Sequence, residues 1–86
     1  MKLSRKELNK LHNYVEKTFT WDYNSPFDHI SGYFLRDTDR DINISLSSFS
    51  TGSKLQIKKK DAYVFDKWIR SFEDVGIFKA MIKGIG

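Results

Sequence analysis

The sequence predicts an α+β fold in the order α-β-β-β-α, with a short extra helix at the C-terminal end. Apolar residues recur at helical spacing near both ends of the chain, whereas in the middle they alternate with polar residues as in strands. The connections between the alternating segments are short, which favours antiparallel pairing. We therefore expect a single compact domain, residues 1–86, in which a three-stranded antiparallel sheet carries the helices on one face.

The first helix is predicted over about residues 5–18. Ser4 and Glu7 have the spacing of a capping box, in which each side chain accepts a hydrogen bond from the other residue's backbone N–H. The stripe that faces the core comprises Leu8, Leu11 and Val15. The opposite side is basic and carries Lys6, Lys10 and Lys17. Such a row is typical of a solvated helix face, but it can also border a binding surface.

Three strands are predicted in the middle of the chain, over residues 29–36, 42–49 and 55–60. The second of them alternates most regularly, with three aliphatic residues on one side and three small polar residues on the other. The stretch before the first strand is predicted to be an irregular loop, because its N-S-P sequence is typical of turns.

A second helix is predicted to begin after Asp61, which is a plausible N-cap residue. The residues that follow at helical spacing are Phe65, Trp68, Ile69 and Phe72. Gly76 is expected to end or bend this helix. The short extra helix is predicted from a further stripe, which comprises Phe78, Met81, Ile82 and Ile85.

The composition excludes several classes of function. The chain has no cysteine, so it has no disulfides, thiolate metal sites or cysteine nucleophile. No apolar run approaches the ~18 residues of a membrane span, and the polar N-terminal stretch is no signal peptide, so we expect a cytoplasmic protein that does not bind membranes. The acidic turn RDTDRD lacks the glycine and glutamate of a calcium loop, and the two histidines have no metal-ligand spacing. We therefore expect a protein that is not an enzyme and uses no metal or cofactor.

Basic residues supply the strongest candidate for a binding surface in a chain whose net charge is +4. Alternate residues of a strand lie ~6.6 Å apart on one face, so the lysines of SKLQIKKKD form a straight row. The neighbouring strand offers small polar groups beside this row, which leave room for a ligand. The predicted nucleic-acid-binding residues are Lys54, Lys58, Lys60, Lys6, Lys10, Lys17 and Tyr33, the last as a stacking ring. The alternative interpretation is that the lysines protect an edge strand against pairing with another chain.

The layout also resembles that of the double-stranded-RNA-binding domain family. The residues that carry this resemblance are TGSK at 51–54 and KKKDA at 58–62, since the family has a glycine-containing loop and a lysine-rich run at the start of its last helix. In the family these contact phosphates, so the resemblance implies RNA binding. Two features depart from the family pattern. The lysines complete a strand here, and the first hairpin is acidic where the family inserts a loop into the minor groove.

Two functional hypotheses follow. The first is a small noncatalytic accessory protein that binds nucleic acid, RNA ahead of DNA, through the basic face of a strand. The second is a small phage-type inhibitor or adaptor that binds a host protein or a defence complex. The second hypothesis draws on the opposite charges of the acidic turn and the lysine row, and on aromatic residues such as Trp21 and Tyr23 that can anchor a protein contact.

Overall fold

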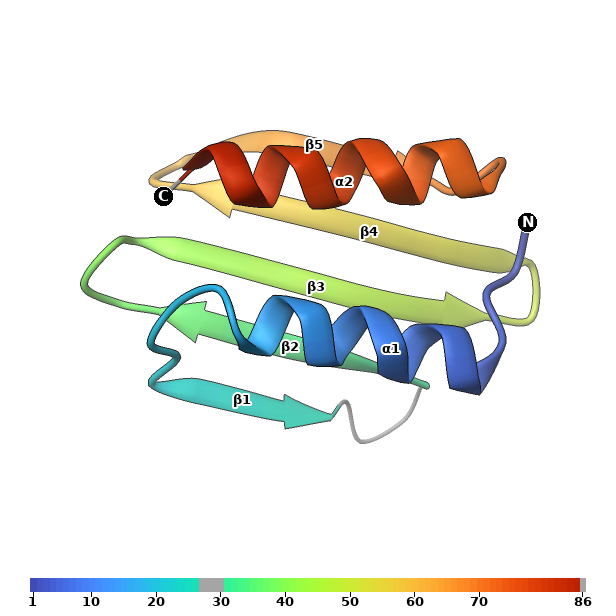
Figure 1. The fold of residues 1–86 in the computed structure, drawn as a ribbon, viewed down its shortest axis with the longest axis horizontal. Coiled ribbons are helices and arrows are strands. Elements are labelled where there is room, and N and C mark those ends of the chain that lie inside the picture. The colour runs from blue at the N-terminus through green and yellow to red at the C-terminus, as the bar shows by residue number, and fades with distance from the viewer. Residues whose placement is uncertain (27–30, 86) are drawn as a thin grey trace.

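The computed structural model of the protein describes residues 1–26 and 31–85. In chain order it contains α1 (Arg5–Glu16), β1 (Tyr23–Pro26), β2 (Ser31–Asp37), β3 (Ile42–Phe49), β4 (Gly52–Lys59), β5 (Ala62–Trp68) and α2 (Phe72–Ile85). The described strands form one antiparallel sheet in sequential order, β1-β2-β3-β4-β5. Both helices lie on the same face of this sheet, with α1 in front of β2 and β3 and α2 in front of β4 and β5 (Figure 1).

The prediction of a three-stranded sheet is wrong, because the sheet has five strands within the described chain. The first additional strand is β1, which was predicted to be an irregular loop. Tyr23 pairs with Arg36 of β2, and Pro26 is the last residue of the strand. A proline is tolerated there because β1 is at the edge of the sheet and proline cannot donate to a ladder. The two helices of the structure lie on one face, but the second of them is not the helix that was predicted to begin after Asp61.

The second additional strand is β5, which occupies most of the segment predicted to be helical. Asp61 does not cap a helix but lies in the turn between β4 and β5, where Lys60 has a φ of 56°. Phe65 and Ile69 are buried, whereas Trp68 and Phe72 are exposed, so the four residues do not form one buried stripe. This strand order also differs from the α-β-β-β-α layout that resembled a double-stranded-RNA-binding domain.

The helix α2 begins at Phe72 and continues through Gly76 to Ile85. It therefore includes the residues of the predicted extra helix, and Gly76, which was expected to end or bend a helix, lies within it. Its start is fixed by the buried carboxylate of Asp74, which accepts hydrogen bonds from the Lys67 ammonium at 2.8 Å and the Arg70 N–H at 2.8 Å. These contacts join the end of β5 to α2.

The N-terminal helix has the capping box that its sequence predicts. The Glu7 N–H donates to the Ser4 hydroxyl at 3.1 Å, and the Ser4 N–H donates to the Glu7 carboxylate at 2.8 Å. The bond from the Ser4 N–H to the Glu7 carboxylate is the main reason that the pKa of Glu7 lies below its ordinary value, and the Ser4 side chain lowers it further. No helix in the described part of the chain is long and apolar enough to cross a membrane.

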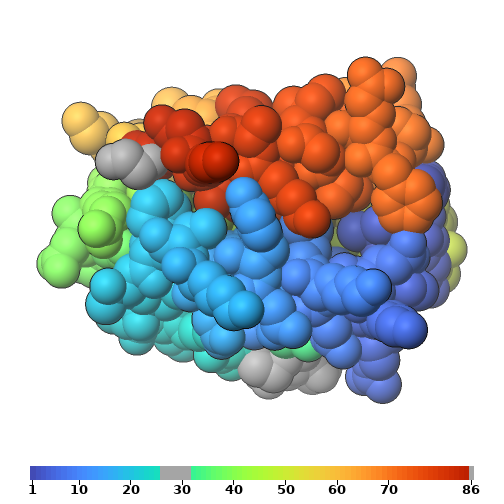
Figure 2. All heavy atoms as spheres, in the orientation of Figure 1, coloured from blue at the N-terminus to red at the C-terminus, as the bar shows by residue number. Residues whose placement is uncertain are grey.

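The hydrophobic core lies between the helices and the sheet. Leu8, Leu11 and Val15 of α1 are buried against it, as predicted. Aliphatic residues of β3 and β4 pair across the middle of the sheet, and the rings of Phe65 on β5 and Phe78 on α2 meet edge to face with their centres 5.5 Å apart. Figure 2 shows the side of the molecule on which the two helices cover this core. No described helix covers the opposite face of the sheet.

Candidate nucleic-acid interface

The face of the sheet without a helix, here called the open face, is built by the alternation of β3 and β4. The inward residues of these strands fill the core, so the residues between them point outward. Three polar residues of β3 pair with three residues of β4 across the open face, and these pairs are Asn43 with Lys58, Ser45 with Gln56 and Ser47 with Lys54. The middle of the open face is therefore polar and basic.

The edge-protection interpretation of the lysine row is wrong. The strand β4 carries Lys54 and Lys58, and it lies between β3 and β5 with paired neighbours on both sides. An internal strand needs no protection against pairing with another chain. The two lysines are thus available for another role on the open face.

The third lysine of the predicted row does not extend it. Lys60 lies in the turn between β4 and β5, and its N–H donates to the carbonyl of Asp41 at 2.8 Å. That carbonyl belongs to the acidic turn between β2 and β3. Lys60 is consequently placed beside acidic residues, beyond the end of the open face.

Exposed aromatic rings lie on the open face, and two of them are beside the lysines of β4. Tyr63 and Trp68 of β5 are 55% and 48% exposed, and Tyr23 of β1 is 51% exposed. The Lys58 ammonium lies 5.6 Å from the centre of the Tyr63 ring, and the Lys54 ammonium lies 5.6 Å from the centre of the Trp68 ring. Tyr23 and Trp68 lay in segments predicted to be loop and helix, and Tyr63 was predicted to open that helix, so none of the three was placed on this face by the sequence. Their β-propensity was the signal that could have found them.

A shallow recess of about 290 Å³ occupies the middle of the open face. The rings of Phe34 and Tyr63 contribute to its lining, as do the cationic groups of Arg36 and Lys58. The remaining lining residues are Asn43, Ser45 and Gln56, whose amides and hydroxyl can donate and accept hydrogen bonds. The recess therefore combines rings, positive charge and polar groups in one place.

The charge of the open face is mainly positive. Arg36, Lys54 and Lys58 contribute cations, and Asp66 of β5 contributes a carboxylate 3.5 Å from the Lys54 ammonium. The Gln56 side-chain amide also donates to Asp66 at 3.0 Å. Exposed ion pairs of this kind contribute roughly 0–1 kcal/mol, so an anionic ligand can compete for Lys54.

The other predicted site residues lie on the opposite side of the sheet. Tyr33 stacks on His12 of α1 with ring centres 3.9 Å apart, and its hydroxyl donates to Asn9 of the same helix. It thus packs α1 against the sheet and does not lie on the open face. The lysines of the first helix, Lys6, Lys10 and Lys17, are on α1 and so are also separated from Lys54 and Lys58 by the sheet.

The acidic turn between β2 and β3 is held in place by an ion pair and by side-chain hydrogen bonds. Asp37 is buried, and its carboxylate accepts from the Arg40 guanidinium at 2.8 Å. Asp22 accepts from the hydroxyl and the N–H of Thr38, and these hydrogen bonds lower the pKa of Asp22. No cluster of metal-binding side chains occurs among the described residues. One of the two histidines, His29, lies outside the described residues.

No protein-family model matches this chain, and no match was found among curated proteins or solved structures. Its function is therefore inferred from the chemistry of its surfaces.

Proposed function

We propose that the protein binds single-stranded nucleic acid, RNA ahead of DNA, through the open face, as a noncatalytic accessory protein of the cytoplasm. The observation that carries the proposal is the pairing of two exposed rings with two lysines on adjacent strands. Rings stack on unpaired bases and lysines contact phosphates, which is how many proteins hold single strands. An A-form duplex offers its phosphates but not its base faces, so exposed rings favour a single strand.

The lysines do not prevent base stacking. A cation over an exposed ring contributes roughly 0.5–1 kcal/mol, and 5.6 Å is near the outer limit of that interaction. Base stacking on an aromatic side chain contributes about 1–3 kcal/mol. A base therefore displaces the ammonium from the ring, and the flexible lysine remains close enough to contact the adjacent phosphate.

The preference for RNA is supported by the polar groups of β3 and β4. Asn43, Ser45 and Gln56 line the recess between the rings and can bond to a ribose 2′-hydroxyl, which both donates and accepts. The Phe34 and Tyr63 rings on the same recess suit one unstacked base. Such contacts add modest discrimination to an interaction whose affinity comes mainly from stacking and phosphates.

The test is a titration of the protein into labelled 12-nucleotide single strands and matched duplexes of RNA and DNA, followed by fluorescence anisotropy. Three cations on the open face predict a slope of about −2 in log K against log salt, so binding weakens about 20-fold between 50 and 200 mM salt. Lys54→Gln/Lys58→Gln is expected to lose most of the affinity. Lys6→Gln/Lys10→Gln is the matched control, because it removes the same charge from α1 on the other side of the sheet. The proposal fails if no strand binds at ~100 µM or if both double variants lose equal affinity.

A further inference from the structure

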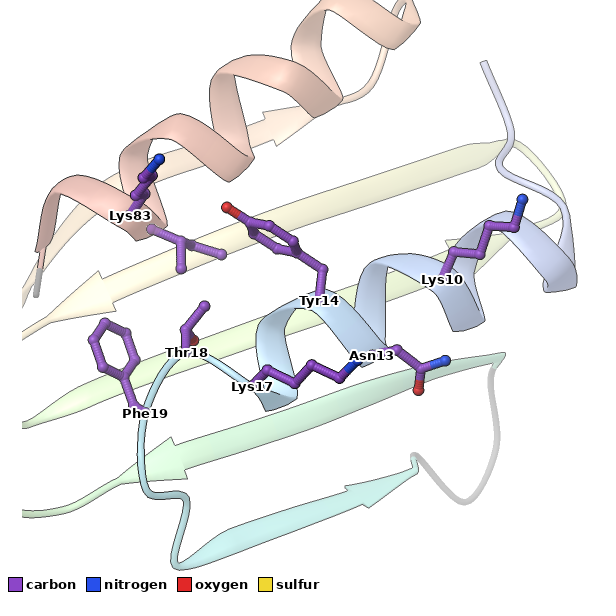
Figure 3. A pocket seen from close by; sticks show the side chains of 8 residues that line it. Lys10, Asn13, Tyr14, Lys17, Thr18, Phe19 and Lys83 are labelled. Atoms are coloured by element: carbon purple, nitrogen blue, oxygen red, sulfur yellow. The ribbon is translucent and has the colours of Figure 1, made fainter.

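A second surface with a different chemistry lies on the helix side of the molecule. A groove of about 700 Å³ runs between the C-terminal halves of α1 and α2. Its apolar lining comes from Tyr14, Phe19 and Ile82, and its charged lining comes from Lys10, Lys17 and Lys83. Figure 3 shows Tyr14 rising between the two helices, with Lys10 on α1 and Lys83 on α2 at the borders of the groove. Every charged residue that lines the groove in the described chain is a lysine.

One of the carbonyls at the end of α1, beside the groove, is satisfied by hydrogen bonds. The carboxyl end of a helix carries unpaired carbonyls, which repel anions. Here the Val15 carbonyl accepts three hydrogen bonds, from the Thr18 N–H, the Thr18 hydroxyl and the Trp21 indole N–H. This carbonyl therefore repels an anion near the end of α1 less than an unpaired carbonyl would.

The aromatic rings of the groove are unsuited to base stacking. The Arg40 guanidinium lies over the Phe19 ring at 5.3 Å from its centre, and the Trp21 ring meets Phe19 edge to face. The Lys79 ammonium lies over the Tyr14 ring at 5.1 Å from its centre. Tyr14 and Phe19 are also half-buried, because both rings pack against the hydrophobic core. The groove therefore offers mainly ring edges and aliphatic surface, unlike the open face with its more exposed rings. Such a floor suits an inserted apolar side chain more than a base.

We propose that this groove docks an acidic segment of a partner protein, which lays one aromatic or large aliphatic side chain against Tyr14 and Phe19. Carboxylates on either side of that anchor pair with the lysines at the borders. The apolar floor provides affinity, and the charge complementarity provides orientation and a fast encounter. The groove and the open face lie on opposite sides of the sheet, so a protein segment and a nucleic acid can be bound at once. The molecule then acts as an adaptor between the two.

The experiment is a selection of peptides from a random dodecapeptide display library on the immobilised full-length protein. Lys10→Glu/Lys17→Glu/Lys83→Glu serves for counterselection, and circular dichroism checks its fold. If the triple variant does not fold, Lys17→Glu alone replaces it, since this side chain is exposed. We expect the selected peptides to be rich in Asp and Glu around one aromatic or large aliphatic residue. Their synthetic forms should bind with micromolar affinity.

Charge variants and nuclear magnetic resonance spectra then test whether the selected peptides bind in the groove. Lys17→Glu is expected to lower the affinity for the peptides at least about tenfold. Lys2→Glu, an equal charge change before α1, should change that affinity less than about twofold. Amide signals of Tyr14 and Ile82 should shift in nuclear magnetic resonance spectra. The proposal is overturned if no acidic peptide is enriched, if both variants act equally, or if the shifts fall on the open face. It is also overturned if single-stranded RNA or a second copy of the chain occupies the groove instead. Lys54→Gln/Lys58→Gln should leave peptide binding intact, so this result is separable from the proposed nucleic-acid binding.

Discussion

Lys58 of β4 and Tyr63 of β5 face each other at a β-bulge, with the Lys58 ammonium 5.6 Å from the centre of the Tyr63 ring. The register shifts here, because Ile57 pairs with the buried Phe65 while Lys58 pairs with Tyr63. Regular alternation from Phe65 would turn Tyr63 toward the core. The extra residue in β5 turns it to the open face instead, as bulges near binding sites often do.

Tyr63→Ala is therefore expected to weaken single-stranded RNA binding. The loss of one stacking ring costs about 1–3 kcal/mol of binding free energy, which corresponds to about a 5- to 150-fold increase in Kd. Tyr63→Phe keeps the ring and should bind within about threefold of the wild type. Fluorescence anisotropy with the same 12-nucleotide RNA measures both, and equal affinity of Tyr63→Ala and wild type would remove the ring from the interface.

The left-handed backbone conformation of Lys60 predicts that glycine at this position stabilises the protein. Lys60 has a φ of 56°, and the left-handed region costs a non-glycine residue roughly 1–2 kcal/mol. Lys60→Gly should raise the free energy of unfolding by about 0.5–1 kcal/mol in urea denaturation, since glycine adopts this φ without strain but has a more flexible unfolded state. Lys60→Ala is the control and should give no such gain. A loss of stability on Lys60→Gly would show that the side chain itself supports the turn.

The Asp74 carboxylate predicts a pH dependence of stability. Hydrogen bonds from the Lys67 ammonium and the Arg70 N–H hold the pKa of Asp74 below its ordinary value of 3.8. The unfolded chain thus binds this proton more tightly than the folded one. The stabilisation is complete above the ordinary value and is lost as the pH falls through the lowered pKa. The stability difference between wild type and Asp74→Asn should therefore be larger at pH 6 than at pH 2.5.

Urea denaturation at a series of pH values measures this difference. Asp61→Asn, an exposed carboxylate in a turn, is the matched control. If the stability difference between wild type and Asp74→Asn is the same at every pH, protonation of Asp74 is not coupled to unfolding.

Local signals decided how much of the fold could be predicted. The capping box of Ser4 and Glu7 involves residues three apart, so the start of α1 could be read from the sequence. The alternation of β3 reflects one buried and one polar face, and it was also readable. In β5 the open face carries Trp68, so apolar residues occur on both faces and the period of two is obscured. The spacing then matched a helix by coincidence.

The candidate site was predictable only in part. Alternation alone placed Lys54 and Lys58 on one face. The face of Tyr33 could not be decided locally, because the adjacent Phe34 is equally suited to either side and only the packing of α1 selects between them. The separation of the α1 lysines from the open face depends on which side of the sheet the helix covers. That is a property of the tertiary structure, which residue patterns along one segment do not contain.

The last prediction concerns the segment that was expected to be a helix and that forms β5 in the structure. In the structure Phe65 is buried against Phe78, whereas Phe72 is 61% exposed. Phe65→Ala should lower the free energy of unfolding by about 3–5 kcal/mol, the usual cost of removing a buried ring. Phe72→Ala should change it by less than about 0.5 kcal/mol, as expected for a surface position. Urea denaturation measures both. Similar losses in the two variants would contradict the strand, because a helix with its stripe toward the core buries both rings alike.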